Sequence, residues 1–77
     1  MFNKLVKYLN NDEYLISLSD SFIHVINYKS IMSLNNNRIE LMLNNKILII
    51  TGEDFIIEKM EKSEMTIKGK ITNIEIK

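Results

Sequence analysis

From Tyr14 onward, apolar and polar residues alternate with a period of two, and this alternation constrains the fold more than any other feature. Successive side chains of a β-strand point to opposite faces of a sheet, so the pattern is typical of strands that bury one face. Ser, Asn, Asp or Gly interrupts the apolar runs at the spacing expected of an all-β domain. The predicted strands cover residues 14–18, 21–27, 29–34, 38–43, 46–51, 54–59, 65–69 and 71–76.

Residues 38–51 predict an antiparallel hairpin. Asn44 and Asn45 separate its two apolar runs, and asparagine tolerates the positive φ that two-residue hairpin turns require. The second run, "ILII" at 47–50, is apolar on both faces, so we expect a central strand. One face would pack on the core and the other on a second layer or another chain. Leu48 and Ile50 are therefore candidate contact residues.

The two glycines of the chain, Gly52 and Gly69, each follow an isoleucine and one polar residue. A glycine inside a strand pattern usually marks a bulge or a sharp bend, and the period of two slips by one after each of them. The alternative is a phosphate-binding loop, but Gly69-Lys70 is followed by Ile71 and lacks an upstream glycine at the required spacing. We therefore interpret both glycines as structural bends.

Two segments carry helical patterns. The apolar residues of 2–10 recur at i, i+3, i+4 and i+7, which predicts a short amphipathic helix. This helix would pack as a lid on the rest of the domain or serve as a basic anchor at a membrane surface, and the lid is favoured because so short a helix needs tertiary support. Residues 54–62 have a helical alternative, since Thr51 and Asp54 resemble a capping box.

Composition excludes several classes of protein. The 77 residues (1–77) form a single domain with a β-rich body over 14–76, and no cysteine is available for a disulfide or a thiolate metal site. The lone histidine, His24, has no second imidazole to help hold a metal. The sequence also shows no set of titratable residues that would converge on a reaction centre, so we expect no cofactor, no small-molecule substrate and no enzyme activity. No apolar run is long enough to span a membrane, and we expect a soluble, cytoplasmic protein.

Equal numbers of basic and acidic residues, ten of each, argue against nucleic-acid binding. The alternative that stays open is a small β-barrel that binds nucleic acid or another polyanion. Its candidate basic residues are Lys62, Lys68, Lys70 and Lys77.

Four stretches carry a family resemblance: "NYKSI" at 27–31, "NRIEL" at 37–41, "IITGEDFII" at 49–57 and "MTIKGKITNIEI" at 65–76. In these stretches the chain resembles the YabP/YqfC family of bacterial sporulation proteins. The resemblance implies a non-enzymatic protein of the mother cell that acts in spore envelope (coat or cortex) assembly beside membrane-associated partners. Asn27 and Lys29 match the family pattern and are possible interaction residues.

The combined expectation is a small antiparallel meander, roll or sandwich of short strands with a short N-terminal helix. Such a module would bind a partner protein, or a second copy of itself as a homo-oligomer, by adding strands at its free edges.

Overall fold

The computed structural model describes residues 13–77, in which all regular structure is β-strand. The predicted helix over 2–10 lies outside these residues. All strand pairs are antiparallel, and the sheet order is β1-β2-β6-β5-β4-β3. The all-β prediction is confirmed. The strands are β1 (Leu15–Leu18), β2 (Phe22–Ile26), β3 (Ser30–Leu34), β4 (Arg38–Met42), β5 (Ile47–Glu61) and β6 (Glu64–Ile76).

The first four predicted strands agree with β1 to β4 within one residue at each end. The last four do not survive as separate strands: 46–51 and 54–59 form the single strand β5, and 65–69 and 71–76 form the single strand β6. The helical alternative over 54–62 is wrong for the same reason. Residues 56–61 pair with β6, and the hydrogen bonds of this long hairpin outweigh a local capping signal.

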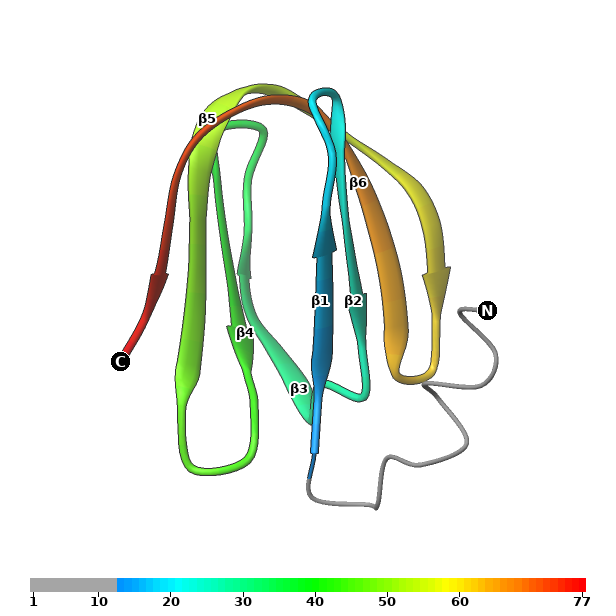
Figure 1. Cartoon of the computed structure of the whole chain (residues 1–77), viewed down its shortest axis with the longest axis vertical. Coiled ribbons are helices and arrows are strands. Elements are labelled where there is room, and N and C mark those ends of the chain that lie inside the picture. The colour runs from blue at the N-terminus through cyan, green and yellow to red at the C-terminus, as the bar shows by residue number, and fades with distance from the viewer. Residues whose placement is uncertain (1–12) are drawn as a thin grey trace.

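The long β5-β6 hairpin bends, and the bend folds the whole sheet into two layers (Figure 1). β2 pairs with residues 64–68 of β6, whereas β4 pairs with residues 47–51 of β5. The first layer therefore contains β1, β2, the first half of β6 and the second half of β5. The second layer contains β3, β4, the first half of β5 and the second half of β6.

The core lies between these two layers. Alternate residues of the central strands point inward and are fully buried, as the period of two in the sequence requires. The first half of β5 is central as predicted, because β4 and β6 flank it. Fully buried side chains of the first layer are Ile23, Val25, Met65 and Ile67, and those of the second are Ile39, Leu41, Leu48 and Ile50.

The bend is built on Gly52, Gly69 and Phe55. The pairing of β5 with β6 shifts register between Thr51 and Gly52 and again between Glu53 and Ile56. A Cβ on Gly52 would lie only 2.0 Å from the carbonyl oxygen of Lys70 and 2.8 Å from the Phe55 ring.

A Cβ on Gly69 would lie 2.9 Å from both the Asp54 carbonyl oxygen and the Phe55 ring. Gly69 also has a φ of 142°, a conformation that other residues rarely adopt. The buried Phe55 ring thus covers both glycines, in the way that an aromatic side chain packs over glycine in a curved sheet. Ring atoms and carbonyl oxygens fill the space next to the glycines, and such carbonyls would repel a phosphate.

Candidate functional site

The structure separates the four residues predicted to take part in contacts. Leu48 and Ile50 are fully buried on the inner face of β5, within the core. The other half of the same folded sheet covers this inner face, so neither side chain is accessible on the surface. Ile49, on the opposite face of β5, is also buried.

Asn27 and Lys29 lie in the connection between β2 and β3. Asn27 has a φ of 70°, its main-chain N–H donates to the Ser63 carbonyl oxygen (N···O 2.6 Å), and its side-chain amide donates to the carbonyl oxygen of Glu13. These contacts give Asn27 a structural role at the junction. Lys29 is exposed, and its main-chain N–H donates to the Met42 carbonyl oxygen (N···O 2.7 Å) just before β3 begins.

β1 and β3 are the two terminal strands of the sheet, so among residues 13–77 each has one edge without a strand partner. Free edges expose main-chain N–H and C=O groups and are natural sites for adding a strand from another chain. On β3 the exposed fractions are 40% for Ile31, 47% for Met32 and 43% for Leu34. Three of the five residues of this edge strand are therefore large, apolar and accessible.

A second free edge runs beside β3. The bend leaves residues 56–61 of β5 paired with β6 on one side only. Two hydrogen bonds, made by Phe55 just before this segment and by Glu61 at its end, join β5 to the chain on either side of β3. The Tyr28 hydroxyl donates to the Glu61 carbonyl oxygen (O···O 3.2 Å), and the Phe55 main-chain N–H donates to the Asn36 carbonyl oxygen (N···O 2.8 Å).

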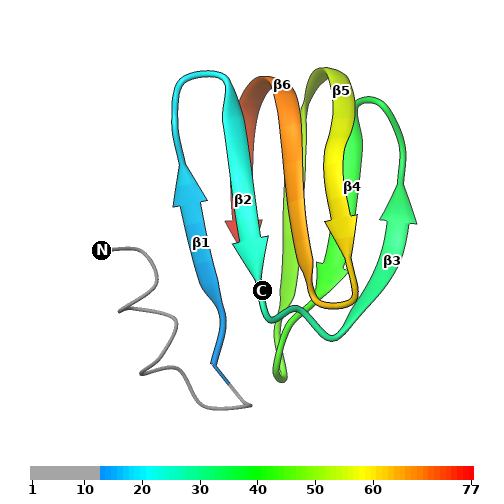
Figure 2. The same cartoon turned by 90° about the vertical axis from the view of Figure 1, so that its right-hand side faces the viewer.

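β3 and the second half of β5 therefore flank the same open side of the folded sheet. Figure 2 shows this side, with β3 at its right. No strand pairing joins β3 to this half of β5. Ile56 and Met60 add exposed apolar side chains from β5. We call the resulting surface the apolar rim, which consists of Ile31, Met32, Leu34, Ile56 and Met60.

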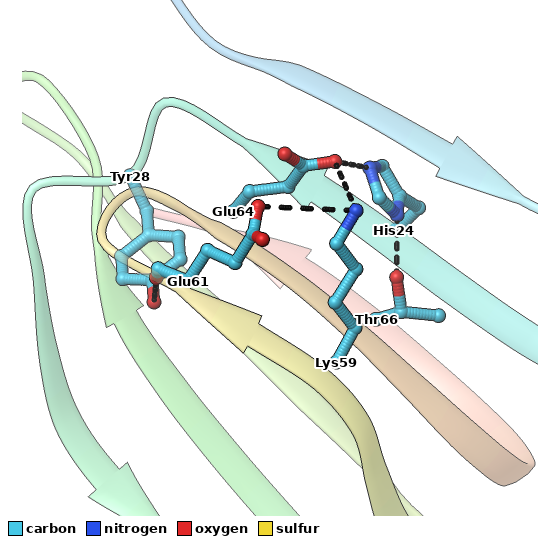
Figure 3. Close-up of polar contacts among 6 residues, drawn as sticks. All are labelled: His24, Tyr28, Lys59, Glu61, Glu64 and Thr66. Carbon is cyan, nitrogen blue, oxygen red and sulfur yellow. Dashed lines mark hydrogen bonds and ion pairs between the residues drawn. The ribbon is translucent and has the colours of Figure 1, made fainter.

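A polar cluster occupies the outer face of the first layer (Figure 3). His24 Nδ1 lies 2.6 Å from Thr66 Oγ1, and its Nε2 lies 2.8 Å from a carboxylate oxygen of Glu64. Lys59 Nζ is 3.7 Å from Glu64 and 3.8 Å from Glu61. Only 16% of the His24 side chain is exposed, and its two ring nitrogens contact Thr66 and Glu64 of β6.

A hydroxyl, an imidazole and a carboxylate in series also occur in hydrolases. In those enzymes, main-chain N–H groups aimed at the substrate carbonyl stabilise the oxyanion. Here His24 and Thr66 lie on β2 and β6, and each of these strands is paired on both sides. Their main-chain N–H groups therefore form the hydrogen bonds of the sheet and do not point at a substrate site. A shallow pocket of about 320 Å³ lies beside the cluster, lined by Ser17, Phe22, His24 and Glu64. We interpret the cluster as a cross-strand link.

Three of the four lysines of the polyanion alternative lie in different parts of the sheet. Lys68 Nζ lies 3.4 Å from the Glu58 carboxylate, and Lys62 occupies the turn between β5 and β6. Lys77 follows the far end of β6, in the second layer, where its main chain exchanges hydrogen bonds with Ile47. Within residues 13–77, no three His, Asp or Glu side chains gather in a way that would hold a metal ion.

The part of the chain that the structure describes contains no helix with the length and apolar character needed to cross a membrane. Comparison of the chain with known protein families, characterised proteins and solved structures finds no match.

Proposed function

We propose that this protein is a non-enzymatic, sporulation-associated interaction module that acts in assembly of the spore envelope (coat or cortex). Its contacts would be made by strand addition at the free edge of β3 and by burial of the apolar rim. The proposal joins two kinds of support. The stretches at 27–31, 37–41, 49–57 and 65–76 resemble the YabP/YqfC sporulation family, and the accessible surface offers a recognition edge.

The observation that carries the proposed contact is the exposure of Ile31, Met32 and Leu34 on an edge strand. Pairing with another strand would satisfy the free main-chain groups, each bond adding about 0.5–1.5 kcal/mol net. It would also remove apolar side chains from water, at about 25 cal/mol per Å². An isolated edge with this composition is an aggregation hazard, which a matching partner removes.

The partner would be a protein: a second copy of this chain or a sporulation protein at a membrane of the mother cell. The corresponding site of action is the mother-cell cytoplasm, including the surface of such a membrane. Lys29, exposed where the chain enters β3, is placed to contact whatever pairs with that strand.

The test is complementation in the organism that carries the gene. A deletion strain should form fewer heat-resistant spores, and the wild-type gene should restore their number. Met32→Lys should fail to restore it, because a charge on the edge opposes strand addition. Leu18→Lys is the matched control, since Leu18 is an exposed apolar residue on the opposite edge strand, β1.

Circular dichroism of both purified variants establishes that the sheet still forms. A deletion strain with unchanged sporulation would refute the role in spore formation. Full complementation by a folded Met32→Lys protein would refute the role of the β3 edge.

A further inference from the structure

We propose that the free edge of β3 pairs with β3 of a second copy of this chain, antiparallel and about a two-fold axis that passes near Met32. This inference rests on the proposed function, in which β3 is the contact strand, and names the partner. A two-fold interface uses the same surface on both copies, so the strand must be complementary to itself.

The charge pattern of β3 meets this requirement. Residues 30–37 contain no charged side chain. In an antiparallel pair centred on Met32, Ile31 lies opposite Ser33 of the second copy, and Lys29 lies opposite Asn35 of the second copy. Like charges directly opposite each other would destabilise a strand pair, and this register contains no such pair.

The other free edges are less suited to self-pairing. A pair centred on β1 would set Glu13 opposite Asp20 of the second copy, and like charges directly opposite each other are destabilising. A pair centred on residues 71–76 of β6 would set Lys70 opposite Lys77 of the second copy, with the same result.

The second half of β5 differs because charges lie within the edge itself. Glu58 is held by Lys68 at 3.4 Å, and Lys59 by Glu61 and Glu64 at 3.8 and 3.7 Å. Charged side chains on an edge strand are a common protection against strand addition. We therefore expect no strand to add at this edge. Its exposed side chains Ile56 and Met60 would instead pack against the strand that pairs with β3.

A β-bulge in β3 lies at the position of the proposed two-fold axis. The pairing of β3 with β4 shifts register between Ile31 and Ser33, which leaves Met32 as the extra residue of a bulge. Met32 is also the most exposed of the three apolar side chains on β3. On the proposed axis the two Met32 side chains would meet each other and be covered.

The chain has no cysteine, so one substitution introduces the only thiol and reports directly on the axis. Residues directly opposite each other in an antiparallel pair have Cα atoms about 4.5–5.5 Å apart, within the range that a disulfide spans. Met32→Cys should form a covalent dimer under mild oxidation at low micromolar protein, as seen on a non-reducing gel. Leu18→Cys on β1, an exposed apolar position outside the apolar rim, is the matched control and should stay largely monomeric.

Sedimentation equilibrium supplies an independent readout. The wild-type protein should show twice the 9.1 kDa mass of one chain, and Met32→Lys should show the mass of one chain with an unchanged circular dichroism spectrum. Equal or faster cross-linking of Leu18→Cys would overturn the assignment of the axis. A wild-type monomer together with an uncross-linked Met32→Cys would overturn the dimer itself.

The two proposals fail in different ways. If the wild-type protein is monomeric but Met32→Lys still abolishes complementation of sporulation, the edge works and another protein occupies it. If the dimer forms through Met32 but Met32→Lys complements fully, the dimer is real and the functional role of the edge is wrong.

Discussion

Replacing Gly52 with alanine tests the structural account of the bend. The added Cβ would lie 2.0 Å from the Lys70 carbonyl oxygen, whereas Cβ atoms in proteins essentially never come closer than 3.0 Å to such an atom. β5 and β6 would have to separate by about 1 Å at this point, which stretches a normal hydrogen bond beyond its accepted length. The nearest obstacle is the main-chain carbonyl of Lys70, so no side-chain rotation relieves this contact.

The cost combines three effects. Overpacking typically destabilises by about 1–3 kcal/mol, and each lost ladder hydrogen bond by about 0.5–1.5 kcal/mol. Alanine also restricts the unfolded chain, which offsets about 0.4–1 kcal/mol. With one or two bonds lost, the net destabilisation of Gly52→Ala is about 3 kcal/mol. A domain of this size has a free energy of unfolding of about 4–12 kcal/mol, so the variant would be marginally folded.

Equilibrium unfolding in urea, followed by far-ultraviolet circular dichroism, measures this effect. With an m-value of about 1–1.5 kcal/mol per M, the midpoint should fall by about 2–3 M. Asn73→Ala is the control, because Asn73 is exposed on β6 opposite Thr51 and its replacement should change stability by less than about 0.5 kcal/mol. A Gly52→Ala midpoint within the range of this control would refute the reasoning.

A second variant identifies the obstacle. Gly52→Ala combined with Phe55→Ala removes the ring but leaves the Lys70 carbonyl oxygen in place, so it should be less stable than Gly52→Ala alone. Recovery of the wild-type midpoint in the double variant would show that the ring, and not the main chain, requires a glycine at position 52.

Three further changes probe the core, a buried phenol and a surface ion pair. Leu48→Ala should lower the free energy of unfolding by about 2–5 kcal/mol in urea titrations, because Leu48 is fully buried between the layers, and a loss below about 1 kcal/mol would contradict its position. Burial raises the pKa of Tyr28 above its ordinary value, so the fold favours the neutral phenol. The stability that the neutral phenol contributes to the fold is complete at neutral pH and should be lost as pH rises above about 10. In Tyr28→Phe, the midpoint of urea unfolding should therefore change less with pH in this alkaline range. An identical alkaline slope in both proteins would contradict this. Lys68→Ala should cost less than about 1 kcal/mol in thermal or urea unfolding, because its partner Glu58 and Lys68 itself are half exposed, and a larger, salt-sensitive loss would indicate a stronger pair.

The alternation and turn residues of this sequence determine where most strands lie. Ile39, Leu41 and Leu43 share one parity, and all three prove to be buried. Asn45 adopts a φ of 63° in the predicted hairpin turn. These features were predictable because strand parity and turn conformation depend on residues a few positions apart.

Other features depend on contacts between residues far apart in the sequence. No local signal shows that the segments around Gly52 and Gly69 are continuous strands, since the outcome rests on Phe55 and on the pairing of β5 with β6. The link from His24 to Glu64 and Thr66 joins strands forty or so residues apart, and a single sequence gives no signal for such a pair.

The apolar run at 47–50 shows the difference between what the sequence determines and what the tertiary structure determines. Its sequence alone required cover on two faces, but it could not tell another protein from another part of the same chain. For the face that carries Leu48 and Ile50, the bend of the β5-β6 hairpin decided this by folding one half of the sheet over the other, and β3 was left at an edge. Local sterics and side-chain parity made the strands, whereas the sheet order, and with it the choice of accessible edge, came only from the packing of the whole domain.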